Sequence, residues 1–172
     1  MSLIVQKYGG TSVGDAERIR AVADHVSRTR RQGHDVVVVA SAMGKETDEL
    51  LRLADQVSRT RPGREMDMLI TAGERKATAL LTMALADVDV AAVSLTGSQA
   101  GFITDTTHQN AKILEVRTDR IKEALAAGRV PVVGGAQGVS AQSRDITFLG
   151  RGGSDTTAVA LAAVLGAEGC EI

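Results

Sequence analysis

Four short polar segments carry the residues whose types and spacing could do chemistry. They are KYGGTS (residues 7–12), SAMGKETD (41–48), TAGER (71–75) and GRGGSD (150–155). Glycines allow backbone N–H groups to approach phosphate oxygens, and the N-terminus of a helix adds partial positive charge. Any one of these segments alone is more often only a turn. Because four of them are predicted to share one face of a small domain, they indicate a site for a phosphate-bearing ligand.

The common signatures of nucleotide and metal sites are missing. A P-loop requires a glycine, four residues of any type and then Gly-Lys-Ser/Thr. The nearest stretch, from Gly9 to Gly14, is followed by Asp15 instead of lysine. Neither glycine-rich turn has the third glycine of the dinucleotide fingerprint. No metal-ligand spacing or Gly-x-Ser-x-Gly elbow is present. The three histidines are His25, His34 and His108, and His108 is predicted to be solvated in a polar loop.

The elements that must position these segments alternate between strand and helix. Strands are predicted at 2–8, 35–43, 90–97, 111–116 and 129–135. Helices are predicted from Asp15 as N-cap to residue 32, from Thr47 or Asp48 as N-cap to before Pro62, and over 65–87, 119–128 and 154–165, with Thr118 capping the fourth. The unbroken β-branched run at 35–43 is typical of a sheet covered on both faces. The prediction is an α/β protein, a three-layer αβα sandwich with a mainly parallel sheet. Ligands of such sheets bind at the carboxyl ends of the strands.

Composition narrows the class of function. A chain of 172 residues with a net charge of −1 predicts one domain without the basic face that non-specific nucleic-acid binding needs. The basic group Arg28, Arg30 and Arg31 is interpreted as a solvated helix end. No apolar run approaches the roughly 20 residues of a membrane span, so no membrane association is expected. The single Cys170 excludes a disulfide framework, is predicted to be buried in a core strand, and fits a reducing cytoplasm.

Several blocks in chain order resemble those of the aspartokinases in the amino acid kinase family. The most specific are VQKYGGTSV, REMDMLITAGER and TFLGRGGSDTTAVALAA. The resemblance covers the chain and implies that residues 1–172 form the N-terminal, amino-acid and phosphate-binding portion of an amino acid kinase domain. It also implies transfer of the γ-phosphoryl group of ATP to the side-chain carboxylate of L-aspartate. The product would be 4-phospho-L-aspartate, on the route to lysine, threonine and methionine.

The resemblance also implies a role for particular residues. Lys7 and Asp155 are expected to be catalytic, with Lys7 on the phosphates. The expected phosphate-binding residues are Lys7, Gly9, Gly10, Thr11, Gly152 and Gly153. The expected substrate-binding residues are Ser41, Thr47, Glu74, Arg151 and Ser154. Arg151 would hold the α-carboxylate, which suits a planar bidentate donor, and Glu74 the α-ammonium group. A simpler alternative is that Ser154 and Asp155 cap the last helix. Mg²⁺ is expected to accompany ATP, held mainly by the phosphates and not by protein ligands.

The chain departs from the family pattern at three places. Ala136 stands where aspartokinases commonly have phenylalanine, and Lys45 and Glu46 differ from the residues expected before Thr47. The family's nucleotide-binding Tyr-Thr-Asp-Val-Asp-Gly segment, a further lysine and the ACT regulatory domains are not in these 172 residues. The expected partners are L-aspartate, ATP, and a second copy or regulatory subunits. By itself the chain is expected to self-associate without phosphorylating aspartate. Two alternatives stay open: an inactive truncated subunit that assembles with a complete one, and a kinase for a related amino acid such as glutamate.

Overall fold

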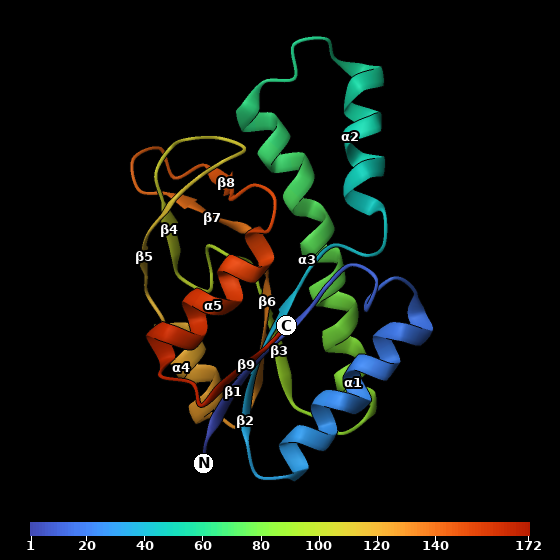
Figure 1. The fold of residues 1–172 in the computed structure, drawn as a ribbon, viewed down its shortest axis with the longest axis vertical. Coiled ribbons are helices and arrows are strands. Elements are labelled where there is room, and N and C mark those ends of the chain that lie inside the picture. Colours follow the sequence, from blue (N-terminus) through green and yellow to red (C-terminus); the bar gives the residue numbers. More distant parts are fainter.

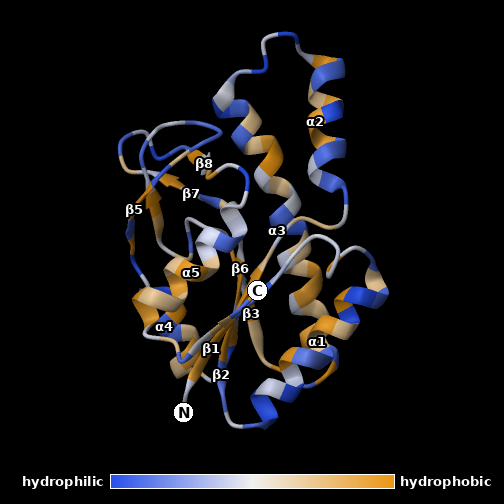
Figure 2. Ribbon diagram, in the orientation of Figure 1, coloured by the Kyte–Doolittle hydropathy of each residue, from blue (hydrophilic) through white to orange (hydrophobic).

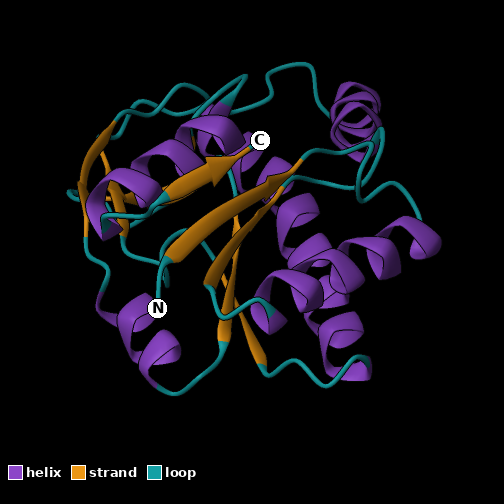
Figure 3. Ribbon diagram, turned by 60° about the horizontal axis from the view of Figure 1, so that its bottom comes forward, coloured by secondary structure: helices purple, strands orange, loops and turns teal.

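The computed structural model describes residues 1–172, which form a three-layer α/β fold around a parallel sheet. The sheet has the order β3-β6-β2-β1-β9, and all its pairs are parallel. Its strands are β1 (Leu3–Tyr8), β2 (Asp35–Ala40), β3 (Ala92–Leu95), β6 (Val130–Gly134) and β9 (Gly169–Glu171). Helices α1 (Ala16–Arg31) and α3 (Gly63–Asp87) cover one face, and α4 (Asp119–Ala126) and α5 (Gly153–Leu165) the other (Figures 1 and 3). The predicted αβα sandwich is confirmed.

Strand β2 supplies both hydrophobic cores, which is why its sequence is an unbroken apolar run. Val36 and Val38 pack into the core beneath α1 and α3, whereas Val37 and Val39 pack into the core beneath α4 and α5. Successive side chains of a strand point to opposite faces, and a sheet buried on both faces therefore needs apolar residues at every position. Figure 2 shows these apolar residues concentrated in the centre of the molecule.

A second, smaller sheet lies at the carboxyl end of the main sheet. It has the order β5-β4-β7-β8, made by β4 (Phe102–Thr104), β5 (Ile113–Val116), β7 (Gln137–Ser140) and β8 (Ile146–Phe148). The sequence indicated only β5, at 111–116. The other three strands, which have three or four residues each, lie outside the strands that the sequence predicts.

Helix starts agree with the prediction in one case and differ in another. Asp15 caps α1 by accepting a hydrogen bond from the backbone N–H of Arg18 at 2.8 Å. The prediction that Thr47 or Asp48 caps the next helix is wrong, because α2 (Glu46–Val57) begins before both residues. Its cap position is Lys45, which makes no side-chain capping bond. Acidic residues in the first turn instead interact favourably with the helix dipole.

One further expectation needs correction. Cys170 is exposed on the edge strand β9, because the sheet gives that strand a neighbour on one side only. The TAGER segment lies in the middle of α3, within the helix predicted at 65–87, and α3 with α2 projects past the end of the sheet (Figure 1). None of the helices has the length and apolarity that a membrane crossing requires.

Candidate active site

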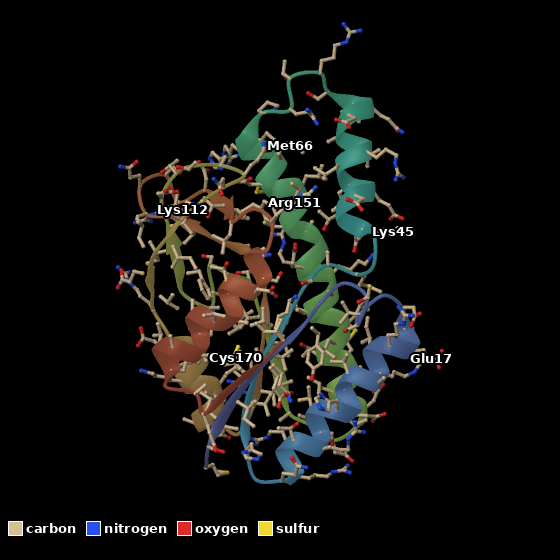
Figure 4. All side chains as sticks on the ribbon, in the orientation of Figure 1. Glu17, Lys45, Met66, Lys112, Arg151 and Cys170 are labelled. Atoms are coloured by element: carbon tan, nitrogen blue, oxygen red, sulfur yellow. The ribbon has the colours of Figure 1, made fainter.

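A pocket of about 300 Å³ lies where the loops after β1 and β2 meet the start of α5 and the middle of α3. Figure 4 shows Arg151 beside α3, just before the first turn of α5. The lining includes ten of the predicted site residues: Lys7, Gly10, Ser41, Thr47, Glu74, Arg151, Gly152, Gly153, Ser154 and Asp155. The other two, Gly9 and Thr11, do not line it. Thr11 instead borders a neighbouring hollow with Tyr8 and His25, on the α1 side.

Lys7 and Asp155 bring the first strand and the last helix together. The Lys7 side chain is 15% exposed, and its Nζ lies 2.8 Å from Oδ1 of Asp155. The two groups form an ion pair that is not aligned as a hydrogen bond. Gly9 lies beside the ammonium group: a Cβ at that position would lie 3.5 Å from Nζ, an ordinary contact distance. Asp155 thus holds the ammonium group of Lys7 at the carboxyl end of the sheet.

The loops after β1 and β2 are bound to each other through two glycines. The backbone N–H of Gly44 donates to the carbonyl oxygen of Gly10 at 2.8 Å. A Cβ on Gly10 would lie 3.0 Å from the carbonyl oxygens of Ala42 and Gly44, closer than a side chain normally approaches backbone. This contact places Ser41 and Thr47 next to Lys7 in the pocket.

The start of α5 is open to the pocket. Gly150 and Gly152 have φ values of 93° and 72°, in the left-handed region that favours glycine. The cap position is Gly152, and no side chain caps the helix. Ser154 and Asp155 lie one and two residues inside it, so the alternative that they cap α5 is wrong. The uncapped first turn presents backbone N–H groups and partial positive charge, which favour an anion.

Arg151 and Glu74 give the pocket two opposite charges. Arg151 is exposed and makes no ion pair with a carboxylate of the chain. Glu74 is only 4% exposed, and its Oε2 has no hydrogen-bond partner. Burial raises the pKa of the Glu74 carboxyl to about 7; the nearby Glu46 raises it further, while a backbone hydrogen bond and Arg75 oppose the rise. A buried carboxylate without a partner is costly, so this group is suited to a cationic ligand.

The turn after β6 packs closely against α5 at Ala136, so the facing residue of the helix, Gly153, has no room for a side chain. A Cβ on Gly153 would lie 2.7 Å from the Cβ of Ala136, and the backbone N–H of Ala136 donates a hydrogen bond to Oγ1 of Thr157 at 3.0 Å. The residue also has a positive φ of 60°. A larger side chain at this position would have to leave the α5 side.

A buried carboxylate, Asp67, was missed by the sequence analysis. Its Oδ2 lies 2.7 Å from Nδ1 of His108 and accepts a hydrogen bond from the backbone N–H of Phe148 at 3.1 Å. Its Oδ1 accepts one from the backbone N–H of Gln109 at 2.9 Å. His108 is therefore half-buried against α3 and not solvated as predicted. Burial of Asp67 could have been predicted from its spacing, because it lies three and seven residues before the buried Ile70 and Glu74, on the same face of α3.

The comparisons with known proteins agree with this geometry. The model of the amino acid kinase family matches residues 2–172, and the chain belongs to that family. The aspartokinase of Mycobacterium tuberculosis (strain ATCC 25618 / H37Rv) is 60% identical over 172 residues, which are 100% of this chain and 41% of the relative. The aspartokinase of Corynebacterium glutamicum is 57% identical, with the same coverage.

A solved structure extends the likeness to the fold. The crystal structure of aspartate kinase from Synechocystis superposes with a TM-score of 0.85 at 52% identity, covering 98% of this chain and 28% of that one. The resemblance stated from the sequence is thereby confirmed. The chain spans less than half the length of the curated relatives it matches.

Proposed function

We propose that this chain forms the amino-acid and phosphate-binding part of an aspartate kinase. The observation that carries the proposal is the pairing, across one small pocket, of a buried carboxyl without a partner and a set of anion-binding groups. The buried carboxyl is that of Glu74. The anion-binding groups are Lys7, Arg151 and the start of α5. An amino acid with an acidic side chain has the complementary charges: one ammonium group and two carboxylates.

In this proposal each charged group of L-aspartate contacts a residue of opposite charge. Arg151 binds the α-carboxylate through its planar guanidinium, which can donate two parallel hydrogen bonds. Glu74 accepts the α-ammonium group and gives up its proton as the cation arrives. Ser41, Thr47 and Ser154 offer hydroxyl groups along the same wall. The side-chain carboxylate of L-aspartate then faces Lys7.

The reaction that suits these residues is direct phosphoryl transfer. An oxygen of the aspartate side-chain carboxylate attacks the γ-phosphorus, the bond to the β–γ bridging oxygen breaks, and ADP leaves. The carboxylate is already ionised at pH 7, so no general base is required and no proton moves. Bringing two anions together is the main difficulty. Lys7 and the backbone N–H group of Gly152 lower that barrier by stabilising charge on the transferring group. The N–H group of Gly153 already donates to the carbonyl oxygen of Gly150 at 3.1 Å, so Gly153 contributes by leaving space for the phosphate.

The same groups fit the phosphates of ATP. Lys7 is a cation at a glycine turn, and the first turn of α5 has unfilled backbone donors, both of which bind phosphate. We propose Gly9, Gly10 and Thr11 as further contacts along the β1 loop. ATP supplies the phosphoryl group when bound, and Mg²⁺, held mainly by phosphate oxygens, reduces their charge. Asp155 keeps Lys7 in place.

The proposal extends to organisation and partners. We infer that residues 1–172 are the N-terminal portion of an amino acid kinase domain, in accord with their 41% coverage of the relatives. The proposed partners are L-aspartate, ATP, and a second copy of the chain or a regulatory subunit. The pathway role is proposed to be the biosynthesis of amino acids derived from aspartate, in the cytoplasm.

Hydroxylamine trapping of the acyl phosphate tests the function. Residues 1–172 are joined to the remainder of the Corynebacterium glutamicum relative and incubated with Mg·ATP and either L-aspartate or L-glutamate. The expected result is aspartyl hydroxamate, at a level close to that of the unaltered relative. Hydroxamate from L-glutamate alone would reassign the substrate. A folded hybrid that yields no hydroxamate, beside an active relative, would overturn the proposal.

A further inference from the structure

A second carboxylate lies beside Glu74, at the first residue of α2. Glu46 is 17% exposed at its side chain, and its Oε1 accepts a hydrogen bond from Nζ of Lys76 at 2.8 Å. Its Oε2 is buried and has no hydrogen-bond partner. Glu46 and Glu74 each therefore hold one buried carboxylate oxygen with no partner in the chain. Glu46 is also one of the residues at which the sequence departs from the aspartokinase pattern.

Close packing of α2 against α3 brings the two carboxylates near each other. Gly73, the residue before Glu74, has no side chain to separate the helices. A Cβ there would lie 2.9 Å from the Cβ of Ala42 and 3.8 Å from Oε2 of Glu46. The charge of Glu46 is accordingly one of the causes that raise the pKa of Glu74. Only Glu74 lines the pocket, so any influence of Glu46 on a ligand passes through its neighbour.

Two like charges held in a partly desolvated place repel each other, and they attract a compact cation. Lys76 does not relieve this repulsion fully, because its ammonium group sits on the outer oxygen, Oε1. The unpaired oxygen of Glu74, beside the charge of Glu46, thus points to a ligand with one positive charge and hydrogen-bond donors. Among ligands that the rest of the pocket accommodates, the protonated α-amino group of an amino acid has this chemistry.

We propose that Glu46 is a positioning residue that sets the selectivity of the pocket for a free α-ammonium group. Fixed by Lys76, it adds negative potential at Glu74 and so favours substrates with a protonated amino group over those in which that group is absent or acylated. The inference rests on the proposed binding of the ammonium group at Glu74. The new element is that Glu46, on α2, is the origin of the preference for a free ammonium group.

This arrangement makes ammonium binding depend on pH. The charged groups around Glu74 are Glu46 from α2, Arg75 and Lys76 from its own helix, Lys7 from β1, and Arg151 and Asp155 from the start of α5. The cation must displace the proton of Glu74, whose pKa is about 7. Affinity for an amino acid should therefore rise with pH and level off above neutrality. An otherwise similar ligand without the amino group should lack this rise.

The test is calorimetric titration of the 172-residue chain with L-aspartate and with succinate, which lacks the amino group, between pH 5.5 and 8.5. Glu46→Gln should weaken L-aspartate roughly 3- to 10-fold at pH 8.5 and move the midpoint of the pH profile down. Lys76→Met leaves Glu46 without its counter-charge and should move the midpoint up. Neither variant should change succinate binding. Glu49→Gln, an exposed glutamate on the same helix, is the matched control.

Opposite midpoint shifts in the two variants would support the inference, and a purely structural defect would not produce them. If Glu46→Gln has the same affinity for L-aspartate and the same pH midpoint as the control Glu49→Gln, the inference is overturned. That result would still leave Glu74 as the ammonium site. If the unaltered chain does not discriminate L-aspartate from succinate at any pH, the proposed function and this inference both fail. Should Glu46→Gln not fold, the Lys76→Met midpoint decides alone: an upward shift supports the inference, and no shift overturns it.

Discussion

The carboxylate of Asp67 joins α3 to the last strand of the small sheet: its Oδ2 accepts a hydrogen bond from the backbone N–H of Phe148, 81 residues further along the chain. The same side chain holds the ring of His108 and the backbone of Gln109. Asp67 is fully buried, so these donors replace all of its hydration. Phe148 is two residues before Gly150, and the contact therefore fixes the strand from which the Arg151 turn departs.

Replacing Asp67 with alanine should cost about 3 to 5 kcal/mol of unfolding free energy. The change leaves two backbone N–H groups and an imidazole without their buried acceptor, which is the costly kind of loss. The measurement is urea unfolding followed by circular dichroism. Asp55→Ala, which removes an exposed ion pair with Arg61, is the control and should change stability by less than about 1 kcal/mol. Equal effects of the two variants would refute the anchoring role.

The predictable parts of this fold are those that local physical chemistry decides. The four consecutive valines of β2 predict a strand buried on both faces, and Asp15 predicts a helix N-cap. Both predictions are possible because each pattern is contained within a few neighbouring residues. The small sheet could not be predicted in the same way, because strands such as β8 are too short to show a pattern. Their stability comes from partners distant in sequence, of which the Asp67–Phe148 contact is one.

The candidate site shows the same division. Glycine turns after β1 and before α5 could be located from sequence, since glycine reports backbone geometry directly. Glu74 could be singled out only through family resemblance, although the helix that carries it, predicted at 65–87, could be recognised from the sequence. Nothing local in the sequence shows that Glu46 meets Gly73, because that contact depends on how α2 packs against α3. Long-range packing, not composition, decides the electrostatics of the pocket.

Arg151→Lys should weaken L-aspartate about 10-fold or more while leaving the stability of the fold unchanged. Lysine keeps the charge but cannot donate two parallel hydrogen bonds to a carboxylate, and one charge-assisted bond is worth roughly 1.5 to 3 kcal/mol. The residue is exposed and makes no ion pair within the chain, so the fold does not depend on it. Calorimetric titration gives the affinity. An unchanged dissociation constant would remove Arg151 from the substrate site.

Gly135→Ala should displace the start of α5. A Cβ at this position would lie 2.6 Å from Oγ and 2.8 Å from Cβ of Ser154, distances that force the helix or the turn to move. Overpacking of this kind costs about 1 to 3 kcal/mol, and the shift should also weaken phosphate binding. The measurements are the melting temperature and titration with inorganic triphosphate. Gly169→Ala, where a Cβ meets nothing within 4 Å, is the matched control and should retain both properties.

The buried carboxyl of Glu74 links function to stability through its pKa. Burial raises that pKa from its ordinary 4.5 to about 7, so the folded state binds the proton more tightly than the unfolded state does. The stabilising contribution of this proton is complete below about pH 4.5 and is lost as the pH rises through 7. Above neutrality the free protein therefore contains a charged, buried group without a partner, in a pocket that a ligand's ammonium group would satisfy.

Glu74→Gln should stabilise the free chain at high pH and abolish its preference for L-aspartate over succinate. Glutamine cannot ionise, so the variant avoids the cost of a buried charge, up to about 3 kcal/mol at pH 8.5, with little difference from the unaltered chain at pH 5. Urea unfolding at both pH values and calorimetric titration at pH 8.5 measure the two effects.

Glu123→Gln, at an exposed position of α4, controls for the loss of one negative charge and should show neither effect. The measured quantity is the unfolding free energy of Glu74→Gln minus that of the unaltered chain. If this difference is smaller at pH 8.5 than at pH 5, the raised pKa is contradicted. Retained selectivity for L-aspartate would separately exclude Glu74 as the ammonium site.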